Sequence, residues 1–339
     1  MKINSRLIPV SILGLTALLI LSQCGSNPDK AMDRALRAYE QQDWIGASLY
    51  AQEFINEFPE DPRLGQAYDI LLSSHLRLNE FALARSVCEE ILEKFPEGPM
   101  RLGAKLTLGR TYIGEGNIDR ALAIFSQIAD STANIQQRLR AVEEAAYTYQ
   151  MMANQVGSST SPYWQRAISV YNDWLELADS QEAAAEIENI TSARLGVLRR
   201  RAEVWVNAGE FMKAAEEFDE LAKDESIPEL TRAEYSHERN VNLQRHLRQE
   251  HPDGPLPPEA QQKLVDAYKK TIENFPDTDF GIWARIELCK LLKPTEPEKA
   301  EEYLSEAIER YQKYVDNPAE QGMLQFYMTK IGDAYLHVE

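Results

Sequence analysis

The stretch 80-EFALARSVCEEILEKFPEGP-99 decides the fold, because a similar stretch, 43-DWIGASLYAQEFINEFPEDP-62, stands 37 residues before it. Each stretch has the apolar spacing of an amphipathic helix and closes on a Phe-Pro pair. Proline cannot continue a helix, and it disfavours the helical conformation of the residue before it, so both helices are expected to end there. The repetition predicts copies of one structural unit.

A third copy follows at the same interval of 37 residues, marked by three alanines, which are Ala47, Ala84 and Ala121. Four and seven positions later, on the same helical face, stand Ala51, Cys88 and Phe125, then Phe54, Ile91 and Ile128. Twelve positions before the alanines stand Ala35, Leu72 and Gly109, and a short polar turn (QQD, LNE or EGN) lies between. Each unit is therefore predicted to be two antiparallel helices joined by a tight turn.

Later units are less regular. Ala214 and Ala300 mark two further copies, and two stretched units are predicted from the helices 138–153 with 163–178 and 229–248 with 258–275. Trp164 follows the polar insert 154–162 and is expected to be partly exposed. The last stretch, 319–339, is predicted to be a single capping helix, since a stack of repeats leaves one apolar face open at its end.

No run of alternating β-branched residues predicts a strand. The sequence therefore predicts an all-α solenoid of about seven helical pairs plus a C-terminal capping helix. It extends over residues 31–339 as one superhelical domain.

These residues resemble the tetratricopeptide repeat family. Its small and aromatic positions are matched by Gly109, Tyr112, Ala121 and Phe125, and the proline after its second helix by Pro59 and Pro96. The family's usual period is about 34 residues, so three extra residues fit a longer link between units. The resemblance implies a superhelix whose first helices line a concave surface.

The start of the sequence is predicted to be a cleaved leader. Lys2 and Arg6 precede 15 mostly apolar residues, 7–21, and this run is shorter than the roughly 20 residues of a spanning helix. The leader holds none of the 54 acidic residues, so the remaining chain is more acidic than the net charge of -18. Nucleic acid and anionic lipid both require basic surface, and neither is expected as the main partner.

The end of the leader, 21-LSQC-24, is similar to bacterial lipoprotein signals, with Gln23 where that family has a small residue. The resemblance implies a signal peptide over 1–23, lipidation of Cys24, and a tether over 24–30. Two alternatives stay open: ordinary secretion with cleavage nearby, and an uncleaved anchor.

No pattern in the sequence indicates catalysis. The five histidines form no metal-binding motif, no glycine-rich phosphate loop is found, and adjacent glutamates diverge by about 100° on a helix. We therefore expect no enzyme, no metal and no cofactor. Besides Cys24, only Cys88 and Cys289 remain, and both are expected to be small buried residues.

If the pairs stack like those of the family, the side chains around the small residue of each first helix face the concave surface. These positions are Tyr39, Asp69, Ser73, Arg77, Arg110, Ile113, Arg199, Glu203 and Arg285. Four are arginines, and guanidinium binds a carboxylate through two parallel hydrogen bonds. The hypothesis is a groove for a partner's carboxylates; the alternative is arginines that pair with nearby acids on a solvated surface.

The sequence favours a scaffold that binds other proteins and no small-molecule substrate. The stretch 58-FPEDPRLGQA-67 is similar to tetratricopeptide lipoproteins that assist β-barrel insertion into the outer membrane, and to Tol-Pal coordinator proteins. That resemblance implies envelope proteins or peptides as partners and membrane contact only through the lipid. It implies a place in the bacterial envelope, at the outer membrane, facing the periplasm or the cell surface. Two alternatives are an accessory activator of peptidoglycan enzymes and a surface-exposed lipoprotein.

Overall fold

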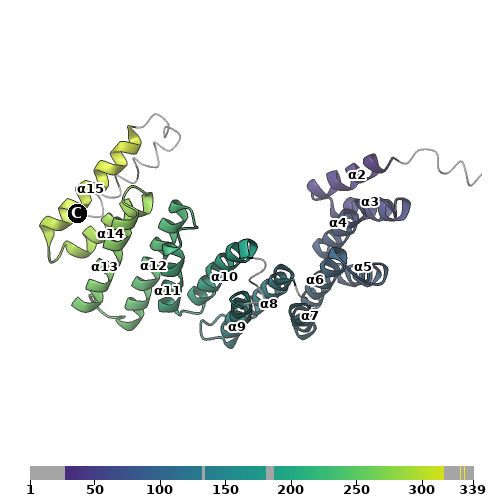
Figure 1. Cartoon of the computed structure of the whole chain (residues 1–339), viewed down its shortest axis with the longest axis horizontal. Helices are drawn as coiled ribbons and strands as arrows, with labels where there is room; N and C mark the ends of the chain where they lie inside the picture. The colour runs from purple at the N-terminus through teal and green to yellow at the C-terminus, as the bar shows by residue number, and fades with distance from the viewer. Residues whose placement is uncertain (1–26, 132–133, 181–186, 317–328, 330–331, 333–339) are drawn as a thin grey trace, which may run out of the picture. The chain divides into compact units, whose positions relative to one another are not determined.

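The computed structural model describes residues 27–131, 134–180 and 187–316, together with positions 329 and 332 (Figure 1). Within these ranges the chain forms fourteen α-helices and no strand. It divides into two compact units, the first ending at Thr132 and the second beginning at Ala133. The predicted all-α fold is confirmed.

The first unit contains three helical pairs. They are α2 (Pro28–Glu40) with α3 (Trp44–Glu57), α4 (Leu64–Arg77) with α5 (Phe81–Lys94), and α6 (Pro99–Gly114) with α7 (Ile118–Ser131). The second unit contains four pairs. They are α8 (Ile135–Val156) with α9 (Pro162–Ala178), α10 (Ile187–Asn207) with α11 (Phe211–Lys223), α12 (Glu229–Glu250) with α13 (Pro258–Asn274), and α14 (Asp279–Leu292) with α15 (Pro297–Val315).

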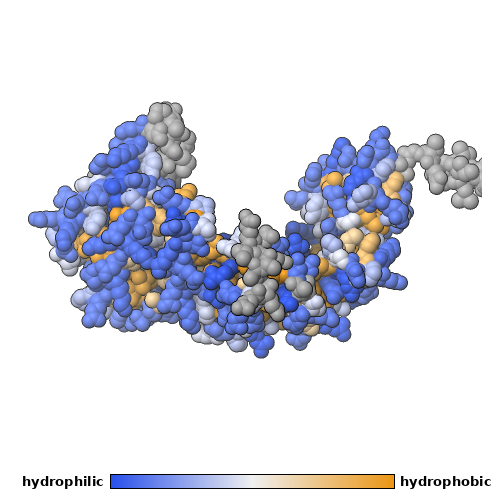
Figure 2. Space-filling view, in the orientation of Figure 1, coloured by the Kyte–Doolittle hydropathy of each residue, from blue (hydrophilic) through white to orange (hydrophobic). Residues whose placement is uncertain are grey.

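The number of pairs agrees with the predicted seven. The leader, Cys24 and almost all of the predicted capping helix lie outside the described residues. One continuous domain over 31–339 stays a prediction. None of the described helices is both long enough and apolar enough to cross a membrane, and most of the surface visible in Figure 2 is hydrophilic.

The two Phe-Pro pairs of the opening stretches end their helices as predicted, and a third pair, at 275–276, ends a further second helix in the same way. The C-caps of α3, α5 and α13 are Phe58, Phe95 and Phe275. Their backbone N–H groups donate to the carbonyl oxygens four residues earlier, at 2.9, 2.8 and 3.0 Å. The proline that follows each phenylalanine has no N–H to offer, so the helix stops.

The tight turn inside a pair has the same backbone conformation in four units. The residue five positions before the marker alanine has a positive φ: Gln42 (60°), Asn79 (58°), Gly116 (76°) and Gly209 (73°). This left-handed conformation reverses the chain, and it suits glycine because glycine has no Cβ. Two of the four units therefore hold a less favourable residue at this position.

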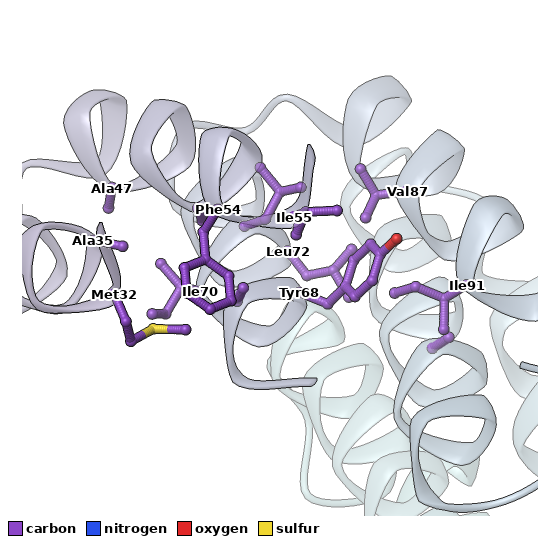
Figure 3. Close-up of a cluster of buried hydrophobic side chains, with 14 of the residues drawn as sticks. Met32, Ala35, Ala47, Phe54, Ile55, Tyr68, Ile70, Leu72, Val87 and Ile91 are labelled. Carbon is purple, nitrogen blue, oxygen red and sulfur yellow. The ribbon is translucent and has the colours of Figure 1, made fainter. Parts of the chain in front are cut away.

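The marker residues form the core of the first unit. Ala47, Ala51, Phe54 and Ala35 are all 0% exposed, and Figure 3 shows Ala35, Ala47 and Phe54 gathered with Tyr68, Ile70 and Leu72. Small side chains at the closest approach let two helices pack tightly, and the larger ones fill the remaining space.

Gly109 shows how tight this approach is. A Cβ built at Gly109 on α6 would lie 2.4 Å from Cε1 of Phe125 on α7. Any side chain here would displace the phenylalanine ring, which is itself fully buried. The glycine is therefore required by packing and not by its backbone conformation.

Both remaining cysteines are buried and free, as predicted. Burial raises the pKa of the Cys88 thiol to about 12 and also raises the pKa of Cys289. The expectation for Trp164 is wrong: only 4% of it is exposed. Its Nε1 donates to the carbonyl oxygen of Ser158 at 3.0 Å, so the insert folds back and covers the ring.

Candidate functional site

The six residues proposed for partner binding all lie on the first helix of a pair. They are Tyr39 on α2, Asp69 and Arg77 on α4, Arg110 on α6, Arg199 on α10 and Arg285 on α14. This helix assignment agrees with the expectation from the repeat. Partner binding by these residues stays a prediction.

In the first unit, Trp44 links two of them. The Tyr39 ring meets the Trp44 ring edge-on at 5.3 Å between centroids, and Cζ of Arg77 lies 5.8 Å from the Trp44 centroid. Asp69 and Arg110 are exposed. Neighbouring groups still desolvate the Asp69 carboxylate enough to raise its pKa.

Arg285 lies elsewhere than the sequence led us to expect. Only 2% of it is exposed, and its Nε donates to Glu306 Oε2 at 2.9 Å. Its Nη1 donates to the carbonyl oxygens of Pro276 and Gly281 at 2.9 and 3.1 Å. The guanidinium therefore ties α14 to α15 and to the link before α14, and does not face a groove.

Arg199 lines an open cleft in the second unit. The cleft has a volume of about 660 Å3 and is lined mainly by α10 and α12, the first helices of two successive pairs, with Phe218 of α11. The residues that matter for its chemistry are Arg199, Glu203, Phe218, Glu234, Tyr235 and Glu238. Pockets of about 300–1,000 Å3 are large enough to enclose several side chains of a ligand.

The cleft carries more negative than positive charge. Nη1 of Arg199 lies 3.0 Å from Oε1 of Glu203, one turn away on α10. Glu234 and Glu238 lie one turn apart on α12. Burial raises the pKa of Glu238; Arg245 opposes the rise, and the carboxylates of Glu234 and Glu203 add to it.

An aromatic pair forms part of the same wall. Tyr235 on α12 stacks against Phe218 on α11, with ring centroids 6.1 Å apart and planes inclined by 27°. Tyr235 is half-buried. Burial raises the pKa of its hydroxyl, so the ring is neutral at physiological pH.

Sequence reasoning found Arg199 and Glu203 but missed Glu234, Tyr235 and Glu238. The first two stand in a regular unit, where the alanine pattern fixes which face of the helix is which. α12 belongs to a stretched unit without an in-phase alanine, so its faces were not assigned. The one available signal was the pair Glu234 and Glu238 beside an aromatic residue, which is also common on solvated helices.

Part of the chain matches a known repeat family. Residues 75–143 match the family model of the tetratricopeptide repeat. The match includes the whole of α5, α6 and α7, so the resemblance seen in the sequence is confirmed for this segment. No curated protein matches the chain.

Solved structures similar to the chain include the following two. One is a tetratricopeptide repeat protein from Parabacteroides merdae, with 11% identity, a TM-score of 0.38, and coverage of 90% of this chain and 98% of that one. The other is the C-terminal part of a TPR repeat-containing protein from Cytophaga hutchinsonii, with 14% identity, a TM-score of 0.46, and coverage of 81% and 93%. The finer resemblance to outer-membrane assembly lipoproteins and Tol-Pal coordinators gains no support from these matches and stays a prediction.

Proposed function

We propose that this protein is a scaffold of the bacterial envelope that holds a segment of another envelope protein in the cleft between α10 and α12. The observation that supports the proposal best is the cleft itself, which is open and lies between the first helices of adjacent pairs. Repeated pairs of this kind build extended binding surfaces. Their ordinary role as interaction modules agrees with the match over residues 75–143.

The side chains of the cleft also suit a binding role. Phe218, Tyr235 and Arg199 lie in its wall, and aromatic residues and arginine are enriched at surfaces that recognise other proteins. Among the described residues, no group of three or more His, Cys, Asp or Glu side chains is placed to hold a metal ion.

The proposal includes a lipid anchor at Cys24 and a location at the outer membrane. The support is the leader with its LSQC end, and the start of α2 at Pro28, only four residues after Cys24. Acylation at two or more positions anchors a protein stably, so the folded part would need no membrane contact of its own. Assistance in outer-membrane protein assembly is the specific role we favour.

A photoreactive amino acid placed at Asn207, which lines the cleft, tests the binding role in intact cells. We expect crosslinks to a discrete set of envelope proteins. The control is the same group at Glu225, an exposed position outside the cleft. Crosslinks at neither position, or equal crosslinks at both, would refute binding in the cleft. Barrel-assembly components among the crosslinked proteins would support a role in outer-membrane protein assembly. Cell-wall enzymes among them would instead support a role as an activator of peptidoglycan enzymes.

Membrane fractionation of a Cys24→Ala variant tests the anchor. We expect the variant to keep its leader, or to be released from membranes, and its mass to lack the acyl chains. A variant that stays with the membranes and has the wild-type mature mass would refute lipidation at this residue.

A further inference from the structure

The charge of the α10–α12 cleft is opposite to that expected from its arginine. Among the residues that the structure describes, Arg199 is the only basic one that lines this cleft, and Glu203 already pairs with it. Glu234 and Glu238 form no ion pair within the described part of the chain. The cleft therefore has two carboxylates to offer a ligand and no uncommitted guanidinium.

These carboxylates stand in a setting that favours an incoming cation. Glu238 is partly desolvated and shares the cleft with Glu234 and Glu203; Arg245 offsets part of the effect, but the three carboxylates still repel one another. A positive group placed among them would remove that repulsion. It would gain charge-assisted hydrogen bonds, which are stronger than neutral ones.

The aromatic wall suits the same kind of ligand. The face of a tyrosine ring attracts ammonium and guanidinium groups, and the alkyl stems of lysine and arginine pack against apolar surface. Tyr235 is held in place by stacking on Phe218 at 6.1 Å. A basic side chain entering the cleft would thus find a ring for its stem and carboxylates for its charged end.

A bare divalent cation fits the cleft less well. These glutamates do not belong to any group placed to hold a metal ion, among the residues that the structure describes. The volume of about 660 Å3 is also far larger than one ion requires. A segment of polypeptide fills the space and supplies the charge at once.

We propose that the α10–α12 cleft binds a basic segment of its partner, with a lysine or arginine side chain facing Glu234 and Glu238 and resting on Tyr235. The inference rests on the proposed function, because it names the chemistry of the partner that the cleft holds. It replaces the sequence-based hypothesis that Arg199 binds a partner's carboxylates.

The test uses the full chain in cells, with the photoreactive group at Asn207 and the substitutions Glu234→Gln and Glu238→Gln together. Glutamine keeps the shape of glutamate and removes its charge. We expect the crosslink yield to fall about tenfold or more, which corresponds to one lost charge-assisted hydrogen bond. Mass spectrometry should place a lysine or arginine within a few residues of the crosslinked position in the partner.

A matched control removes the same charge elsewhere. Glu301 and Glu302 are exposed on α15, and we expect Glu301→Gln with Glu302→Gln to leave the yield unchanged. An equal fall in both double variants would show general attraction to an acidic protein and overturn the inference. An unchanged yield in the cleft variant, or an acidic partner segment, would also overturn it while leaving the proposed function in place. No crosslink from Asn207 in the wild-type protein would instead refute the proposed function.

A charge exchange sharpens the result. A synthetic peptide copied from the mapped segment should bind the purified full chain, and its affinity should fall as salt rises. The same peptide with its basic residue changed to Glu should lose binding to the wild type and regain it with a Glu234→Lys variant. Competition by calcium chloride or spermidine at micromolar concentration would identify the occupant as a free cation and overturn the inference.

Discussion

The helix pairs of the first unit and the α12–α13 pair of the second unit are held together by different interactions. Between α2 and α3 the buried side chains are apolar, from Met32 and Ala35 to Phe54. Between α12 and α13 lies a buried polar network. Its members are Ser236, Arg239, Asn240 and Thr271, none more than 6% exposed.

The direction of the hydrogen bonds marks the difference. In the described part of the first unit, the buried polar side chains Ser74 and Thr111 bond to carbonyl oxygens four residues back on their own helices, at 2.7 and 2.9 Å. In the second unit, Arg239 Nη2 donates across to the carbonyl oxygen of Ala267 at 2.7 Å and to Thr271 Oγ1 at 3.0 Å. Polar side chains there form hydrogen bonds between two helices, and not only within one helix.

The comparison teaches that the same pair geometry can be specified in two ways. In the regular units, small apolar residues at a fixed interval set how the helices approach each other. In the α12–α13 pair, directional hydrogen bonds are added to an apolar cluster that includes Leu247, Ala260 and Leu264, and each bond fixes one relative position of the helices. A polar network is costly when a member is lost, because the remaining groups stay buried without partners.

The largest predicted effect comes from removing the centre of this network. Arg239→Met should lower the free energy of unfolding by about 2–4 kcal/mol, because Asn240 Oδ1 would lose both hydrogen bonds from Arg239 while still buried, and Asp219 would lose one of its cations. The matched control is Arg199→Met, which breaks a half-exposed pair with Glu203 and should cost less than about 1 kcal/mol. Urea unfolding followed by circular dichroism measures both.

Equal losses in the two arginine variants would break the comparison, since they would mean that the buried network contributes no more than a surface ion pair. If only Arg239→Met lowers the free energy of unfolding, and the urea slope stays unchanged, the contrast between the buried network and a surface ion pair is strengthened. The slope reports the surface exposed on unfolding, so it also shows whether the second unit still unfolds as one body.

The next effect concerns the apolar packing of α6 against α7 in the first unit. Gly109→Ala should destabilise the protein by about 1–3 kcal/mol, because its Cβ would lie 2.4 Å from the Phe125 ring. Gly103 lies on the same helix α6 and has no heavy atom within 4 Å of an added Cβ. Gly103→Ala should therefore stabilise by up to about 1 kcal/mol through helix propensity. Thermal unfolding should show that Gly→Ala destabilises at position 109 and stabilises at position 103. Changes in the same direction at both positions would refute the packing explanation.

The regular units and the α12–α13 pair also differ in how much of their structure the sequence predicts. The regular units were predictable down to single residues such as Ala47, Cys88 and Phe125, because the 37-residue interval aligns them. Helices α12 and α13 were also predicted, over 229–248 and 258–275. The polar network buried between them was not predicted.

The reason is that burial of a charge depends on partners far away in the chain. The sequence led us to place Arg285 on the concave surface and gave no prediction for Arg239, yet their partners are Glu306 and Asp219, about 20 residues away. The cleft was half predicted for a similar reason, since Glu234 and Glu238 become part of a site only because the fold brings α12 to the cleft that α10 also lines. Sequence periodicity indicates which face of a helix is buried and does not indicate which other helix meets it.

A smaller effect is a dependence of stability on acid pH. Burial acts to raise the pKa of Asp219, but Lys223, Lys270 and Arg239 outweigh it and hold this pKa well below its ordinary value of 3.8. A lowered pKa in the folded state contributes stability that is fully present above the unfolded value. This contribution is lost as pH falls from there through the folded value.

Unfolding of the wild type and of Asp219→Asn should be compared in urea at pH 6 and at pH 3. The wild type should be the more stable at pH 6, and its advantage should shrink at pH 3. Other acidic groups titrate equally in both proteins, so the difference isolates Asp219. An advantage that does not change with pH would show that its ion pairs add nothing to folding.

The smallest predicted effect lies in the turn that both units share. Gln42 adopts a φ of 60° where Gly116 and Gly209 adopt 76° and 73°. A residue with a Cβ loses about 1–2 kcal/mol in this conformation, whereas glycine loses more entropy on folding. Gln42→Gly should therefore stabilise by about 0.5–1 kcal/mol, and Gly116→Ala and Gly209→Ala should each destabilise by a similar amount. Because the turn depends only on the backbone, these changes should be alike in the two units, in contrast to the pairing substitutions. A difference between Gly116→Ala and Gly209→Ala larger than the measurement error would mean that the interior of a pair also controls its turn.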